Sequence, residues 1–144
     1  MIYSNDFESD TSVCGIDIPI IQGEQSTCLS KEVQFRVYSI ELTPETAGAD
    51  WVRATADFRC GNKEWATWYM AQMAVEFYDE NNENIKSNMI RVYRFMDDGS
   101  TNTIFLDASF PKKEKVNKIK IQFWNAEGTK KLLIDNLKVE TFDA

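Results

Sequence analysis

The stretch WVRATADFRC, residues 51–60, alternates two sets of side chains from end to end. Successive side chains of a β-strand point to opposite faces, so this alternation is typical of a strand with one face in the core and one toward solvent. The predicted core set is Val52, Ala54, Ala56, Phe58 and Cys60. The predicted outer set is Trp51, Arg53, Thr55, Asp57 and Arg59.

The same two-residue period recurs along most of the chain. It predicts further strands within residues 70–79, 82–95, 101–111, 116–124 and 132–142. An earlier strand pair is predicted in residues 2–8 and 31–42, and polar turns separate all these segments. No segment of 11 or more residues has a convincing helical period. The sequence therefore predicts an all-β fold, an antiparallel two-sheet β-sandwich with little or no helix.

The predicted strand within residues 31–42, KEVQFRVYSIEL, changes its apolar phase along its length. Its apolar residues form two sets of opposite phase: Val33, Phe35 and Val37, then Tyr38, Ile40 and Leu42. A β-bulge or a bend between two sheets would explain the change, so we predict one of these features in this segment.

Composition excludes several classes of function. A length of 144 residues suits one domain, and the formal net charge of -7 argues against nucleic acid and against an anionic membrane surface as partners. The chain contains no histidine, which excludes Ser-His and Cys-His nucleophiles and His-ligated zinc. No run of roughly 18 apolar residues is present, so we predict no membrane insertion by this segment.

Strand-like sequence stands close to both ends of the chain. We interpret residues 1–144 as a single β-sandwich domain taken from a longer protein, whose other domains would be partners. Cys14 and Cys28 bracket a loop-like segment, where a disulfide would contribute about 3 kcal/mol and imply an oxidising compartment. The alternative is three reduced thiols in a cytosolic domain, with Cys60 buried in its strand.

Five segments in order resemble one known family. They are NDFE (5–8), WVRATADF (51–58), MAVEFYDENNENI (73–85), FLDASFPKKEKVNKIKIQFWN (105–125) and LLIDNLKV (132–139). This order resembles the jelly-roll carbohydrate-binding modules of the galactose-binding-domain-like group. The resemblance implies a jelly-roll sandwich that acts as an extracytoplasmic accessory domain, either secreted or in the cell envelope.

The resemblance also implies a structural calcium ion between the first and last strands. Glu8 and Asp135 occupy the matching positions. Asp135 shares the two-residue phase of Leu133, Leu137 and Val139, so it is predicted on the core side, where a carboxylate is costly unless it is paired. Calcium prefers oxygen ligands and would compensate that charge. Alternatively, Asp135 lies at a sheet end, where it accepts backbone N–H bonds or pairs with a lysine.

Sugar binding calls for flat aromatic faces beside polar side chains. The candidates share the outer phase of their strands and are Trp51, Arg53, Gln72, Glu76, Arg91, Tyr93 and Trp124. If their strands are neighbours, they form one platform on the outside of one sheet. An alternative loop site is the cluster EWATWY, residues 64–69. Alternatively, the tryptophans cover the core and bind nothing.

The sequence therefore predicts a non-catalytic carbohydrate-binding domain that holds a glycan by aromatic stacking. The alternative is a sugar-independent structural or protein-interaction domain of a larger cell-envelope or secreted protein. We predict no enzymatic activity, because nothing places two carboxylates at the ends of facing strands and no nucleophile or phosphate motif is present.

Overall fold

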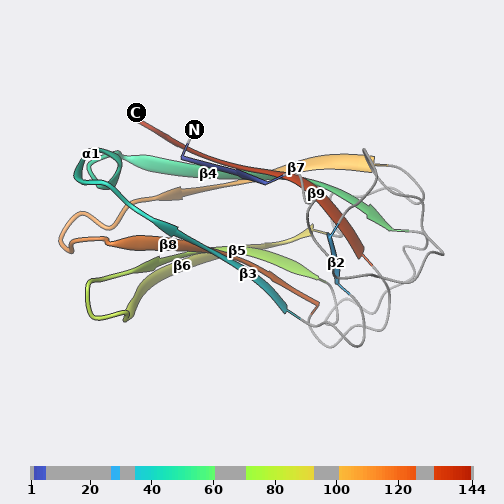
Figure 1. Ribbon diagram of the computed structural model, residues 1–144, viewed down its shortest axis with the longest axis horizontal. Coiled ribbons are helices and arrows are strands. Elements are labelled where there is room, and N and C mark those ends of the chain that lie inside the picture. The colour runs from blue at the N-terminus through green and yellow to red at the C-terminus, as the bar shows by residue number, and fades with distance from the viewer. Residues whose placement is uncertain are drawn as a thin grey trace.

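The computed structural model describes residues 2–5, 27–29, 35–60, 71–92, 101–125 and 132–143. Within these ranges the chain forms nine strands and one short helix (Figure 1). The elements in order are β1 (Tyr3–Asn5), β2 (Thr27–Leu29), β3 (Phe35–Glu41), α1 (Pro44–Ala47), β4 (Trp51–Cys60), β5 (Gln72–Tyr78), β6 (Asn84–Arg91), β7 (Thr101–Ser109), β8 (Lys118–Trp124) and β9 (Leu132–Phe142).

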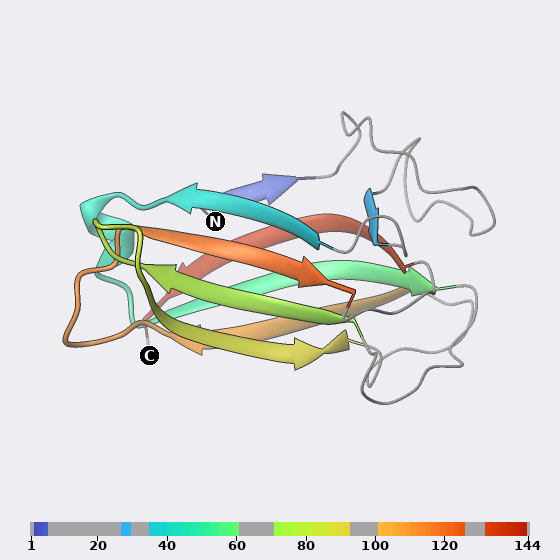
Figure 2. The ribbon, with the colours of Figure 1, turned by 90° about the horizontal axis from the view of Figure 1, so that it is seen from below.

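The strands form two antiparallel sheets stacked face to face (Figure 1). Sheet A has the order β1-β9-β4-β7, and β2 also pairs with β9. Sheet B has the order β3-β8-β5-β6, which is the layer nearer the viewer in Figure 2. The first and last strands lie side by side, with Tyr3 opposite Val139. The predicted all-β sandwich is confirmed.

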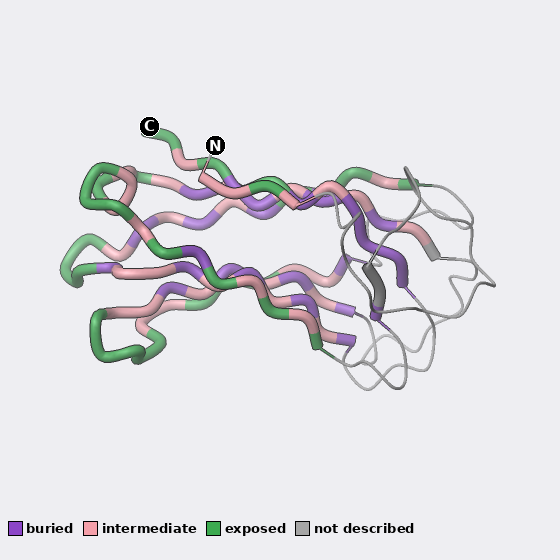
Figure 3. Tube along the Cα trace, in the orientation of Figure 1, coloured by how far each residue is buried: buried purple, intermediate pink, exposed green. Residues whose placement is uncertain are grey.

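The core fills the space between the two sheets, where every second residue of the central strands is buried (Figure 3). Phe58 of β4 contacts Phe123 of β8 edge to face, with ring centroids 5.9 Å apart, so this pair joins the two sheets. Burying each such side chain contributes about 1.5–3 kcal/mol relative to leaving it exposed. The fully buried alternating residues of β4 are Val52, Ala54, Ala56 and Phe58, as predicted.

Strand β3 contains no bulge, which corrects the prediction for residues 31–42 as far as the structure describes them. It pairs with β8 residue by residue, from Phe35 opposite Trp124 to Glu41 opposite Lys118. Only one of its two apolar sets faces the core: Ile40 is buried, whereas 52% of Phe35 is exposed. The other set lies on the outer face of sheet B.

The extra residue in the sandwich lies in β9 instead. The pairing of β4 with β9 changes register between Thr55 and Asp57, and Asn136 adopts a left-handed conformation with φ of 51°. One extra residue in a strand reverses which face the following side chains take. Asp135 is therefore the register partner of Asp57, which belongs to the outer set. The side chain of Asp135 does not share the core face of Leu137. The predicted core-side placement of Asp135 is wrong, although the residue is fully buried.

The short helix α1 follows Thr43, whose side chain accepts a hydrogen bond from the backbone N–H of Thr46. Thr46 in turn accepts from the N–H of Thr43 at 2.9 Å, which completes a capping box. Within the described residues, no helix is long and apolar enough to cross a membrane.

One edge of the sandwich is held by a lysine. Lys86 of β6 is the register partner of the buried Phe77, so it points inward. Its Nζ donates to the backbone oxygen and to Oγ of Ser109 on β7, both at 2.6 Å. Strands β6 and β7 end their respective sheets, so this contact ties the two sheet edges together.

Candidate functional site

The predicted sugar platform is divided between the two sheets. Trp51 and Arg53 lie on β4 of sheet A, which pairs with β7 and β9. Gln72, Glu76, Arg91 and Trp124 lie on β5, β6 and β8 of sheet B. The expectation of one platform is therefore wrong, because strand alternation fixes the face of a residue but not the sheet that its strand joins.

Several predicted site residues fall outside the part of the chain that the structure describes. They are Glu8, Tyr93 and the aromatic cluster at 64–69. The side chains of Cys14 and Cys28 are also outside it, so both alternatives for this pair stay predictions.

On sheet B, the register aligns four residues across the outer face. Phe35 is opposite Trp124, Trp124 is opposite Gln72, and Gln72 is opposite Arg91. We call these four residues the Trp124 row. Neighbouring strands lie about 4.8 Å apart, so the row spans about 14 Å.

The two aromatic residues of the Trp124 row are stacked. The rings of Phe35 and Trp124 are 4° from parallel, and their centroids are 5.9 Å apart. Offset stacking of this kind fixes the orientation of both rings. The row therefore presents an ordered aromatic surface at its β3 end and polar side chains at its β6 end.

The next residues along the strands extend this surface. Val37, Gln122, Ala74 and Met89 are aligned beside the Trp124 row. Met89 is 50% exposed, and Ala74 leaves the middle of the face low. Among the described residues, the amides of Gln72 and Gln122 form no hydrogen bond. These amides are available for a ligand.

Farther along the same face, the polar groups are partly engaged. The Lys120 ammonium lies 4.4 Å from the ring centroid of Tyr78. Glu76 accepts a hydrogen bond from Nδ2 of Asn84 at 3.0 Å. Glu76, one of the predicted sugar ligands, thus lies on the same face as Trp124 but is held by a neighbouring side chain.

The outer face of sheet A carries a second aromatic group, in which the charges are paired. Trp51 stacks on Phe142, with centroids 6.3 Å apart and an angle of 11°. The Arg53 guanidinium lies 4.5 Å from the Phe105 ring centroid and donates to both carboxylate oxygens of Asp107, at 2.7 and 2.9 Å. Hydrogen bonding to Asp107 raises the pKa of Arg53 above its ordinary value.

Phe35 and Met89 are site residues that the sequence did not point to. Phe35 was counted with a set of apolar residues that a bulge would turn inward. The available signal was the two-residue period of a regular strand over residues 35–41. That period places Phe35 and Val37 on one face of the strand and the buried Ile40 on the other.

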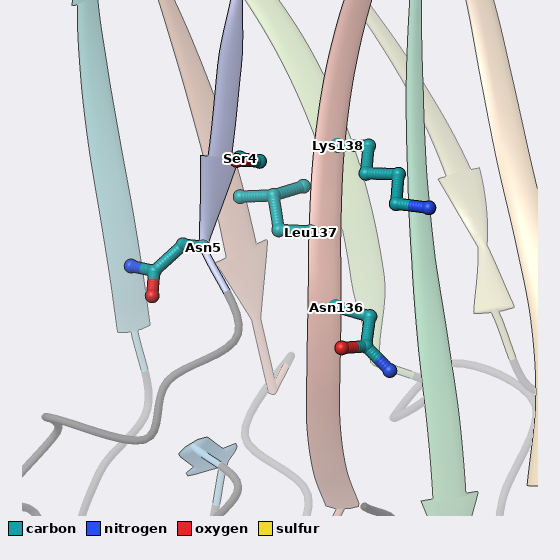
Figure 4. A pocket seen from close by; sticks show the side chains of 5 residues that line it. All are labelled: Ser4, Asn5, Asn136, Leu137 and Lys138. Carbon is teal, nitrogen blue, oxygen red and sulfur yellow. The ribbon is translucent and has the colours of Figure 1, made fainter.

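A hollow of about 330 Å³ lies on sheet A, away from the Trp124 row (Figure 4). It is lined by Ser4, Asn5, Asn136, Leu137 and Lys138. In Figure 4 the side chains of Asn136 and Lys138 extend from β9 toward β4. The Asn136 amide donates to Oδ2 of Asp57 at 2.9 Å, which holds the bulge of β9 against β4.

The predicted metal residue Asp135 lies next to this hollow in the chain. Its Oδ1 accepts a hydrogen bond from the backbone N–H of Asn136 at 2.8 Å. Asp57, another carboxylate, is its register partner on the same face. Within the described ranges, no group of three or more His, Cys, Asp or Glu side chains is placed to hold a metal ion.

No protein-family model matches the chain, and no curated protein matches it in sequence. Solved structures with a similar fold include the CBM22-1 xylan-binding domain from Paenibacillus barcinonensis Xyn10C, with 13% identity, a TM-score of 0.54, and coverage of 99% of this chain and 95% of that one. They also include Family 16 Carbohydrate Binding Module-2, with 12% identity, a TM-score of 0.55, and coverage of 83% and 79%.

A third similar structure is the enzymatically active domain of bacteriophage CBA120 tailspike protein 4, with 11% identity and a TM-score of 0.49. The match covers 75% of this chain and 14% of the tailspike chain. The two matches with higher TM-scores are to carbohydrate-binding modules, and the likeness concerns the fold. The chain has the jelly-roll fold of carbohydrate-binding modules, as the resemblance in sequence implied.

Proposed function

We propose that this chain is a non-catalytic carbohydrate-binding domain that binds glycan on the outer face of sheet B. The observation that supports it most directly is the Trp124 row, where a stacked aromatic pair stands beside uncommitted polar groups. The C–H faces of sugar rings pack on aromatic side chains, and amides such as that of Gln72 bond their hydroxyls.

The shape of the face favours a stretch of polysaccharide over a single sugar. The Trp124 row crosses four strands, and the neighbouring residues of the described strands widen it into a broad surface. An open surface buries only one side of each sugar, so several sugars must contribute to a useful affinity. A similar fold in a domain described as xylan-binding makes xylan the first ligand to test.

The test compares two tryptophans on opposite faces. Binding of the domain to soluble xylan and to other soluble β-glycans is measured by affinity electrophoresis and by calorimetry. Trp124→Ala is expected to abolish binding, whereas the matched control Trp51→Ala, on sheet A, is expected to retain it. Unchanged thermal melting would show that each variant is folded. Equal binding by wild type and Trp124→Ala, or no binding to any glycan, would overturn the proposal.

A second candidate function is supported by the outer face of sheet A. Phe105 is 55% exposed there, and Arg53 is held in place by Asp107 and by the neighbouring rings. Aromatic residues and ordered arginines dominate the energetics of protein interfaces. This face would contact another domain of the parent protein. If so, Phe105→Asp should lower the melting temperature of this domain within the longer protein and leave that of the isolated domain unchanged.

We also propose a structural calcium ion at Asp135, with Glu8 as its partner ligand. Support comes from the complete burial of the Asp135 carboxylate and from the second carboxylate, Asp57, opposite it in register. Like charges at paired positions destabilise a sheet, and a hard cation would offset that repulsion. Both the glycan and the calcium assignments are consistent with an extracytoplasmic location, which we propose for the domain.

A further inference from the structure

The charges on the outer face of sheet B are not all balanced. Glu41 is opposite Lys118, and Glu76 is opposite Lys120. Arg91 is opposite the neutral Gln72. Arg91 is thus the one described cation of this face with no carboxylate at the paired position.

The guanidinium of Arg91 is also uncommitted. Among the residues that the structure describes, it forms neither a hydrogen bond nor an ion pair. Arg53 on the opposite face shows the contrast, because its Nε and Nη2 both donate to Asp107. A free guanidinium offers a planar pair of donors that matches a carboxylate or another oxyanion.

Arg91 occupies the polar end of the Trp124 row. Two strand spacings, about 10 Å, separate it from Trp124, with Gln72 between them. A glycan chain stacked on Trp124 and lying along the row would therefore bring a neighbouring sugar to Arg91. The net charge of -7 opposes anions at long range. At physiological salt that repulsion is screened beyond about 8 Å, so the contact with Arg91 dominates.

We propose that the sheet B site prefers anionic glycans, and that Arg91 binds the acidic group of a sugar next to the one stacked on Trp124. This proposal rests on the proposed glycan function and names its ligand class. The acidic group is a carboxylate or a sulfate ester, since either oxyanion accepts two parallel hydrogen bonds from arginine.

The experiment uses matched polysaccharides. Glucuronoxylan is compared with the same material after chemical reduction of its carboxyl groups, and a sulfated xylan forms a third arm. Calorimetry is expected to show a preference of about tenfold for at least one acidic form over the reduced form. The arm that shows the preference identifies carboxylate or sulfate.

Three variants test whether Arg91 causes the preference for the acidic polysaccharide. Arg91→Gln should lose the preference, so that it binds the acidic and the reduced polysaccharide with similar affinity. Arg91→Lys, which keeps the charge but not the paired donors, should retain only part of it. Lys118→Gln removes the same charge from the far end of the face and should keep the full preference.

Two results would overturn the proposal while leaving the glycan site intact. One is wild-type binding that does not distinguish acidic from reduced polysaccharide. The other is an Arg91→Gln variant that keeps the preference. Absence of binding to every polysaccharide, or binding that Trp124→Ala does not change, would instead overturn the proposed function itself.

Discussion

Phe35 and Trp124 stand on directly paired residues of β3 and β8, and their rings are stacked within 4° of parallel. Both belong to the outer face of a sheet, and 52% of Phe35 is exposed. Two ordered rings on a solvent-facing strand pair contribute little to the core. Such an arrangement is the one that our proposed glycan site requires, because the C–H faces of sugar rings pack on aromatic side chains.

Phe35→Ala is expected to weaken glycan binding about two- to tenfold, the usual contribution of an aromatic pair beyond its buried area. Melting temperature should change little, because the side chain is half exposed. The matched control is Phe105→Ala, which removes a similarly exposed phenylalanine from sheet A. Comparable losses of affinity in both variants would contradict a site confined to sheet B.

Lys86→Met should destabilise the fold by about 1–3 kcal/mol, since Ser109 loses two charge-assisted hydrogen bonds at the sandwich edge. An inward-pointing charge also discourages edge strands from pairing with other chains. The variant is therefore expected to associate at high concentration. Urea denaturation and size-exclusion chromatography measure the two effects. Lys112→Gln, on an exposed turn, serves as the control, and equal urea midpoints for the two variants would refute the assignment.

Asn136→Ala should be less stable than Asn136→Gly by about 1 kcal/mol, although both lose the hydrogen bond to Asp57. The difference arises because φ of 51° is strained for alanine but not for glycine. Thermal melting of the two variants measures it. If alanine proved the more stable, β9 would not depend on this left-handed residue for its change of register.

Millimolar CaCl₂ is expected to raise the melting temperature of the wild-type domain relative to EDTA. A ligand at one hundred times its dissociation constant stabilises the folded state by about 2.7 kcal/mol. Asp135→Asn should remove the calcium-dependent part of this shift, while Asp143→Asn, an exposed carboxylate near the end of β9, should keep it. Identical melting of the wild type in calcium and in EDTA would eliminate the proposed ion.

The sequence was sufficient to predict the sandwich, because β4 and β8 alternate without interruption and no segment shows the helical period that the long helices of an α/β fold would require. It was insufficient wherever two strands had to be placed relative to each other. Trp51 and Trp124 have the same outer phase, yet their strands belong to different sheets. Only the pairing of strands that are distant in sequence shows that the two tryptophans lie on different sheets.

The position of Asp135 failed to follow from its spacing for a related reason. The period of Leu133, Asp135 and Leu137 is regular along the chain, but one residue between them turns left-handed and reverses the face. Asn accepts that conformation more readily than most residues, so the signal was present but weak. The error at Phe35 was the reverse of the error at Asp135. A bulge was expected in its strand, but β3 is regular.

The pairing of Tyr3 with Val139 brings the two ends of the described chain into sheet A (Figure 1). Any polypeptide that continues from either end departs from the layer opposite the Trp124 row. If the proposed glycan site is correct, domains attached to either end would join on the side of the sandwich away from that site.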